Sequence, residues 1–144
     1  MELTVACMAT TGECFCGAVS YAICGVLGDA RSCHCSRCRK AFSAQASAHA
    51  VVDANDFKWL TGEHLLTSYV GEHGFGLQFC KVCGSTLCTV HNSVVHGITL
   101  GSLNGDPQVT LGMHIYVGSK AKWETIAPGV PQYEKDPPQS TEPC

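Results

Sequence analysis

Seven of the eleven cysteines lie in three short clusters that have the spacing of metal ligands. The clusters are Cys14-Phe15-Cys16, Cys33-His34-Cys35-Ser36-Arg37-Cys38 and Cys80-Lys81-Val82-Cys83. A C-x-x-C turn directs two thiolates toward one point, and C-x-C does the same from a strand, where residues i and i+2 share a face. Gly84 follows the last cluster and suits the tight turn of a metal-binding knuckle. These residue types and spacings predict zinc binding.

The seven thiolates divide unevenly between two zinc ions. The C-x-C-x-x-C cluster is compact enough to hold one ion, which leaves the first and third clusters to share the other. We call the two groups the three-cysteine site (Cys33, Cys35 and Cys38) and the four-cysteine site (Cys14, Cys16, Cys80 and Cys83). Four thiolates close a tetrahedron and favour a structural zinc, whereas three leave a position open, as in catalytic zinc sites. Such an open site can hold a substrate thiol as thiolate.

Three basic residues accompany the three-cysteine site. Arg37, Arg39 and Lys40 lie within and just after it, where they could offset thiolate charge or bind an anionic substrate. We predict that these three residues bind substrate. His34 would face away from the flanking cysteines on an extended segment, so we interpret it as a neighbour of the ligands or a surface residue.

Other interpretations of the cysteines remain open at this point. Disulfides, buried thiols or redox chemistry would explain C-x-x-C without metal, and an iron–sulfur cluster also binds thiolates. A single zinc beside a redox-active three-cysteine cluster is a further alternative. We interpret Cys88 as a core residue, and Cys7, Cys24 and Cys144 as ordinary thiols because they lie in no ligand motif. His49, His96 and His114 are expected on strands as partly buried residues, although each could approach the open zinc.

The bulk composition is that of a globular protein, and 144 residues predict a single domain over 1–144. A net charge of -3 without a basic run argues against nucleic acid as the main partner. No apolar run reaches the ~20 residues of a membrane-spanning helix. The segment from Met1 to Thr11 does not resemble a signal peptide, so we expect a cytoplasmic protein without membrane contact.

Alternating apolar residues separated by turn formers predict a mainly β protein. The expected strands are Cys16 to Cys24, Ala46 to Val52, Leu65 to Val70, Ser85 to Val90, Val94 to Leu100 and Met113 to Val117. One short helix is expected from Arg37 to Phe42, capped by Ser36. The segment from Gly71 to Gly76 is predicted as a turn. The tail 128–144 holds five of the six prolines, and we expect it to dock on its own domain or on a neighbour.

Seven segments in and around the cysteine clusters, which together extend over nearly the whole chain, occur in the same order in one known protein family. They are Gly12 to Tyr21, Cys33 to Lys40, Asp56 to Gly62, Phe79 to Ser85, Gly101 to Leu103, His114 to Val117 and Trp123 to Tyr133. Their order resembles the glutathione-dependent formaldehyde-activating enzyme family, which includes centromere protein V. The resemblance implies an Mss4-like fold, with small coiled antiparallel sheets around zinc and one or two short helical turns.

The resemblance also implies a structural role for the four-cysteine site and a catalytic role for the three-cysteine site. The implied reaction condenses formaldehyde with glutathione to S-hydroxymethylglutathione, a carbon–sulfur lyase reaction in reverse. The partners would be a small thiol and an aldehyde. Compared with many members, this chain has Phe42-Ser43 in place of Gly-Ser, Asn104 in place of Asp, and Leu77-Gln78 where an Arg is common.

Three functions therefore remain to be weighed. The first is the thiol-dependent lyase, and the second is a lyase or hydrolase on another small adduct, which the departures near the pocket motivate. The third is a non-catalytic zinc-binding interaction module. Short strands and an ordered tail are compatible with a homodimer.

Overall fold

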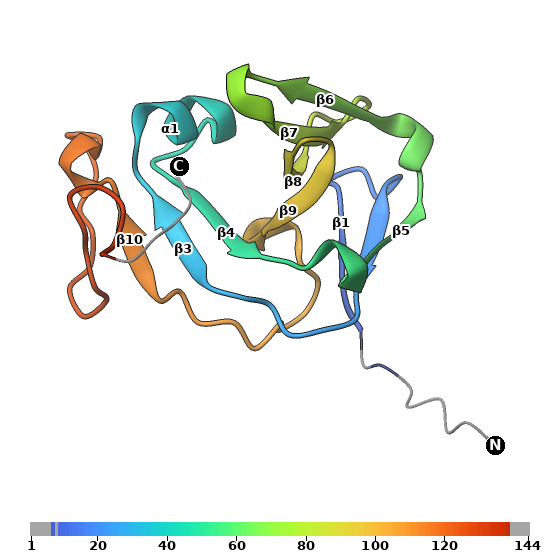
Figure 1. Cartoon of the computed structure of the whole chain (residues 1–144), viewed down its shortest axis with the longest axis horizontal. Coiled ribbons are helices and arrows are strands. Elements are labelled where there is room, and N and C mark those ends of the chain that lie inside the picture. Colours follow the sequence, from blue (N-terminus) through green and yellow to red (C-terminus); the bar gives the residue numbers. More distant parts are fainter. Residues whose placement is uncertain (1–6, 8, 139–144) are drawn as a thin grey trace.

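The computed structural model describes Cys7 and residues 9–138, which form two β-sheets and one α-helix (Figure 1). The smaller sheet has the order β1-β2-β5, and the larger has the order β10-β3-β4-β9-β8-β7-β6. The strands are β1 (Thr10–Glu13), β2 (Ser20–Ile23), β3 (Ala30–Cys33), β4 (Ser47–Val51), β5 (Phe57–Thr61), β6 (Leu66–Val70), β7 (Phe75–Cys80), β8 (Thr86–His91), β9 (Val94–Thr99) and β10 (Met113–Ile115). The predicted mainly β class is confirmed.

The larger sheet is broader than the small antiparallel sheets that the resemblance implied. It has seven strands and is mixed, because β10 pairs with β3 in parallel. The helical content is one α-helix, α1 (Ser36–Phe42), and five 3-10 turns in the described residues. These turns are η1 (Ala54–Asp56), η2 (Glu63–Leu65), η3 (Glu72–Gly74), η4 (Leu100–Ser102) and η5 (Val117–Ser119). None of the described helices has the length and apolar character needed to cross a bilayer.

The core contains buried side chains from both sheets. In β2 the side chains of Tyr21 and Ile23 are fully buried, whereas Ser20 and Ala22 are only partly buried. This alternation is that of a strand with one buried face. Leu87 and other buried side chains of the larger sheet pack against them. The core thus fixes how the first strands lie relative to the rest of the chain.

Helix α1 begins at a cysteine of the three-cysteine site. Its N-cap is Cys35, whose Sγ accepts a hydrogen bond from the backbone N–H of Cys38 at 3.3 Å. The prediction that Ser36 caps the helix is therefore wrong by one residue, since the sulfur takes the place usually held by a side-chain oxygen. The helix ends at Ser43, which has a left-handed backbone with φ 49°.

The six predicted strands are present with shifted ends, but four others were missed: β1, β3, β5 and β7. The segment 16–19 was predicted as strand, yet it forms a turn before β2. The turn predicted up to Gly76 ends earlier, because β7 starts at Phe75. Gly76 marks a close approach rather than a turn, since a Cβ there would meet the carbonyl oxygen of Tyr69.

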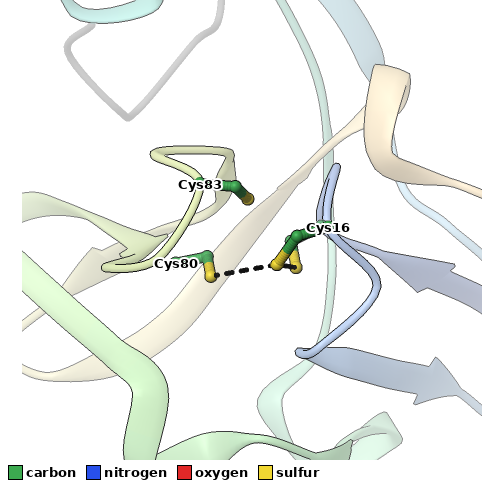
Figure 2. Close-up of side chains that lie close together, drawn as sticks. Cys16, Cys80 and Cys83 are labelled. Atoms are coloured by element: carbon green, nitrogen blue, oxygen red, sulfur yellow. Dashed lines mark hydrogen bonds between the residues drawn. The ribbon is translucent and has the colours of Figure 1, made fainter.

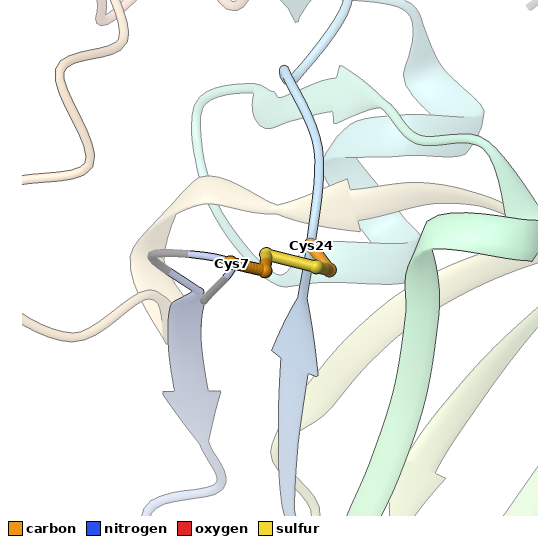
Figure 3. The surroundings of a disulfide bond; sticks show 2 residues. All are labelled: Cys7 and Cys24. Atoms are coloured by element: carbon orange, nitrogen blue, oxygen red, sulfur yellow. A yellow bond between two sulfur atoms is a disulfide. The ribbon is translucent and has the colours of Figure 1, made fainter. Parts of the chain in front are cut away.

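A disulfide joins Cys7 to Cys24, so the interpretation of both as ordinary thiols is wrong (Figure 3). Thr10 of β1 pairs with Ile23 of β2 in antiparallel register. This pairing brings the chain before β1 beside the chain after β2, and the two Cα atoms lie 5.8 Å apart, within the usual range. Cys144 lies outside the described residues.

The segment that follows β10 returns along it. The N–H of His114 donates to the carbonyl of Pro131 at 2.8 Å, and the N–H of Tyr133 donates to the carbonyl of His114 at 2.9 Å. The Tyr116 hydroxyl donates to the Asp136 carboxylate at 2.7 Å. This stretch of the proline-containing tail therefore lies against the edge strand of the larger sheet, whereas residues 139–144 are outside the described part.

Candidate metal centres

The four-cysteine site forms where two turns from different sheets meet (Figure 2). The turn after β1 supplies Cys14 and Cys16, whereas Cys80 is the last residue of β7 and Cys83 lies in the turn that follows. The Sγ atom of Cys16 lies 3.5 Å from that of Cys14 and 3.9 Å from that of Cys80. All four sulfur atoms lie within 4.8 Å of one another.

Both turns contain a glycine in the left-handed conformation. Gly17 and Gly84 have φ of 78° and 77°, in the left-handed region that favours glycine. The Gly17 N–H donates to the Cys14 carbonyl at 2.9 Å, and the Gly84 N–H donates to the Cys80 carbonyl at 2.7 Å. Each glycine thus closes a tight turn around a pair of thiols. The expectation of a glycine-dependent knuckle at Gly84 is confirmed, and the first turn repeats it.

Hydrogen bonding among the four thiols lowers the pKa of some and raises the pKa of others. Burial raises the pKa of Cys83, but hydrogen bonds from backbone N–H groups and from the Cys16 and Cys80 thiols together have the larger, opposite effect. The pKa of Cys83 is therefore lowered to about 6. The pKa of Cys14 is also lowered, because the Val19 N–H and neighbouring thiols outweigh burial. A backbone hydrogen bond lowers the pKa of Cys16, yet the Cys14 thiol and other effects raise it to about 11.

The geometry of the four thiols fits zinc. Tetrahedral zinc with Zn–S bonds of ~2.3 Å places its sulfur atoms about 3.8 Å apart. The separations of 3.5 and 3.9 Å lie on either side of this value. A donor set of four thiolates is typical of a closed structural zinc.

The three-cysteine site lies at the junction of β3 and α1. Cys33 is the last residue of β3, Cys35 caps the helix and Cys38 lies in its first turn. Their sulfur atoms lie within 4.8 Å of one another, and among the described residues no fourth Cys, His, Asp or Glu joins the group. Cys33 is fully buried, whereas Cys35 and Cys38 are partly exposed. The donor set fits a soft metal ion such as zinc that retains an open position.

A cavity of about 760 Å³ is lined by Cys14 of the four-cysteine site and by neighbours of the three-cysteine site, but not by Cys33, Cys35 or Cys38 themselves. It adjoins the three-cysteine site because Ser47 pairs with Cys33 across β3 and β4, and because Phe42 lies one helical turn after Cys38. Most polar groups around it are hydroxyls and one amide: Ser43, Ser47, Ser85, Thr86, Thr99, Ser102 and Asn104. Glu13 is the one carboxylate, and no Lys, Arg or His is among the lining residues.

Residues 9–119 match the family model described as glutathione-dependent formaldehyde-activating enzyme. The chain belongs to this family. No curated protein matches it. Among solved structures, a Rhodobacter sphaeroides protein is similar, with 25% identity and a TM-score of 0.53, over 85% of this chain and 98% of that one.

Three basic residues of this chain were predicted to bind substrate, and all three lie on α1. Arg37 and Lys40 are exposed and Arg39 is partly buried. None of the three lines the cavity of about 760 Å³. The Nε–H of Arg39 is buried and has no hydrogen-bond partner among the described residues. Their role in substrate binding stays a prediction.

The feature that the sequence did not reveal in this family member is the environment of His34. Its ring is 1% exposed, so it is not a surface residue. Its Nδ1 lies 3.2 Å from a carboxylate oxygen of Glu124, and its Nε2 lies 2.9 Å from Nδ1 of His114. Burial lowers the pKa of His114, His34 lowers it further and Glu124 opposes the shift. Glu124 is 90 positions away from His34, and although it lies in the segment Trp123 to Tyr133, no local pattern pointed to this contact.

Of the three histidines expected on strands, His49 lies in β4, His96 in β9 and His114 in β10. All three are partly buried, as predicted. None belongs to either described cysteine group. Cys88 is fully buried in β8, which confirms its interpretation as a core residue.

Proposed function

We propose that the protein is a zinc-dependent carbon–sulfur lyase of the S-hydroxymethylglutathione synthase type, with a small thiol and an aldehyde as reactants. The observation that carries the proposal is the partly exposed group of Cys33, Cys35 and Cys38, whose neighbours Phe42 and Ser47 line a cavity of about 760 Å³. Family membership over residues 9–119 supports the reaction class.

We assign one zinc to each cysteine group. The four-cysteine site would hold a structural ion that ties the turn after β1 to the turn after β7. The three-cysteine site would hold the second ion and present its open position toward substrate. Bound there, zinc would supply Lewis acidity, which stabilises a thiolate and polarises a carbonyl oxygen.

The reaction needs no oxidant or reductant. The thiol sulfur forms a bond to the aldehyde carbon, and the carbonyl π electrons pass to oxygen. The thiol proton ends on that oxygen, so the adduct contains every atom of both reactants. In the reverse direction the C–S bond breaks and the hydroxyl proton returns to sulfur.

The cavity would hold the part of the thiol that does not react. Its volume of about 760 Å³ is sufficient for a peptide-sized thiol. Hydroxyl groups such as those of Ser43 and Ser47 offer both donors and acceptors to amide groups of such a ligand. The chain would thereby orient the thiol and limit its motion, which lowers the entropic cost of the reaction.

A second candidate has a specific observation in its favour. Phe42 and Asn104, two of the positions that depart from the family pattern, both line the cavity. Leu77 and Gln78 do not, because they lie in β7, where the Gln78 side chain accepts a hydrogen bond from Cys88. The same catalytic group could therefore serve a lyase or hydrolase reaction on another small adduct.

Zinc content and turnover together test the proposal. We expect two zinc ions per wild-type chain. We also expect the protein to accelerate adduct formation from glutathione and formaldehyde relative to buffer, with the rate measured by NMR exchange spectroscopy. Cys35→Ser should retain the four-cysteine zinc, lose the second and reduce the rate to that of the uncatalysed reaction. Ser36→Ala, its exposed neighbour, is the matched control.

A wild-type chain that binds one zinc, or a Cys35→Ser variant with unchanged turnover, would contradict the proposal. Two zinc ions without any thiol-dependent turnover would instead favour a non-catalytic binding module. Turnover with another thiol adduct but not with glutathione would favour the second candidate.

A further inference from the structure

We propose that Glu124 and His114 are positioning residues for the three-cysteine site, and that they act through the ring of His34. We call these three residues the His34 clamp. The inference rests on metal binding at Cys33, Cys35 and Cys38, as proposed above, but not on the identity of the substrate.

Both ring nitrogens of His34 are engaged in the interior. A carboxylate only accepts, so Nδ1–H of His34 donates to Glu124 across 3.2 Å. In the neutral ring, Nε2 then accepts from Nδ1–H of His114 across 2.9 Å. The ring is 1% exposed, so rotating it would leave buried polar atoms without partners. Its orientation is therefore fixed.

The partners of His34 come from a part of the chain that supplies no metal ligand. His114 lies in β10, and the His34 backbone N–H donates to the carbonyl of Ile115 in the same strand at 2.9 Å. Residue 34 is thus held through both backbone and side chain. Two nearby hydrogen bonds hold the backbone of Glu124. The Glu124 N–H donates to the Ala121 carbonyl at 3.2 Å, and Nζ of Lys120 donates to the Glu124 carbonyl at 2.9 Å.

The consequence for the metal follows from the position of His34 in the chain. It is the single residue between Cys33 and Cys35, so its backbone sets the separation and direction of their two sulfur atoms. An open site with three ligands has no fourth thiolate to compensate when two of them move. In metalloproteins, loss of partners that orient the ligands costs roughly 10-fold to 100-fold in metal affinity.

The negative charge of Glu124 does not explain why a carboxylate occupies this position. Its side chain is 15% exposed, and it is not part of the group of potential ligands. A carboxylate would add negative charge near thiolates instead of offsetting it. The contact with His34 is what remains, and it serves to orient the ring.

The test compares zinc release from the two sites of one molecule. Zinc-loaded protein is mixed with a chromogenic chelator, and the two release phases are assigned with Cys38→Ser, which lacks the second ion. We expect Glu124→Ala to accelerate release of the second zinc about 10-fold to 100-fold and to leave the first unchanged. His114→Ala should change release in the same direction.

A conservative variant and a matched control separate positioning from general stability. Glu124→Gln keeps an acceptor oxygen and should restore most of the wild-type release rate, whereas Glu134→Ala, an exposed carboxylate of the same segment, should have no effect. In Co²⁺-substituted protein, Glu124→Ala should alter the thiolate-to-cobalt bands of the second site only.

Unchanged release and unchanged cobalt bands in both Glu124→Ala and His114→Ala would overturn the clamp. Equal acceleration at both sites would also overturn it, because that result reflects a general loss of stability. A wild-type protein with only one release phase would instead refute the metal assignment in the proposed function, and these failures are therefore distinguishable.

Discussion

Cysteine side chains of one chain differ widely in acidity here because their surroundings differ. Burial alone acts on Cys88 and raises its pKa to about 12, whereas donors around Cys83 lower its pKa to about 6. Cys88 donates a hydrogen bond to Gln78, and Cys83 lies among thiols that could share a metal. Spacing separated these two cysteines correctly, and the surroundings supply the physical reason.

His49 should make the stability of the protein depend on pH. Burial lowers its pKa from 6.5 to about 4, and Arg31 and His96 add to the shift. The unfolded chain therefore binds more protons between these values, so the free energy of unfolding falls as the pH drops from about 6.5 to about 4. The loss should be at most roughly 3–4 kcal/mol.

Urea unfolding at several pH values measures this effect. His49→Gln should weaken the dependence of the free energy of unfolding on pH. His64 is an exposed histidine on η2, and His64→Gln should retain this dependence. Zinc release at acid pH affects both variants alike, so the difference between them isolates His49. A wild-type curve with the same slope as that of His49→Gln would contradict the prediction.

At the scale of elements, the two glycine-closed turns are what bring the thiols together. Replacing Gly84 by Ala should destabilise the protein by about 1–2 kcal/mol, since a side chain disfavours the left-handed conformation. Gly101→Ala is a suitable control, because its φ is not positive and a Cβ there would meet nothing within 4 Å. Urea unfolding of zinc-loaded protein compares the two. Equal stability of both variants would show that the turn tolerates a side chain.

The disulfide that joins the ends of β1 and β2 should stabilise the native state. It closes a loop with a sequence separation of 17, and a loop of that length gives about 3 kcal/mol in the chain-entropy account. We expect reduction, or the double change Cys7→Ser with Cys24→Ser, to lower the free energy of unfolding by a similar amount. Purified protein with both thiols free by mass spectrometry, or equal unfolding with and without reductant, would contradict this.

At the scale of the whole molecule, both sheets and α1 meet around the cavity, and its charge should select among thiols. With Glu13 as the one charged lining residue, a thiol without carboxylates should bind better than one with two. We expect the diethyl ester of glutathione to bind up to about fivefold more tightly than glutathione, the size of an exposed charge effect. Titration calorimetry measures both ligands.

Glu13→Gln should remove most of that preference, and Glu63→Gln, an exposed carboxylate on η2 that does not line the cavity, should leave it intact. Tighter binding of glutathione itself to the wild type would contradict the prediction. That result would point to a cation outside the lining set, such as Arg37 or Arg39 on α1.

The sequence by itself determined what depends on short separations along the chain. C-x-C and C-x-x-C spacings place sulfur atoms together within a turn, and counting ligands divided them into groups of four and three, which the structure holds within 4.8 Å. Alternation predicted six strands, but β3 and β7 were missed because pairing with neighbours forms them. The same alternation correctly predicted the mainly β class.

Tertiary structure alone decided the contacts between distant segments. The pairing of β1 with β2 brings Cys7 to Cys24, and the pairing of β10 with β3 brings His114 to His34. The segment after β10 brings Glu124 to the same ring. No local pattern encodes such contacts, because each depends on how several strands fold together. The thiols that could hold zinc are therefore specified by spacing, whereas the surroundings of the open site are specified by the fold.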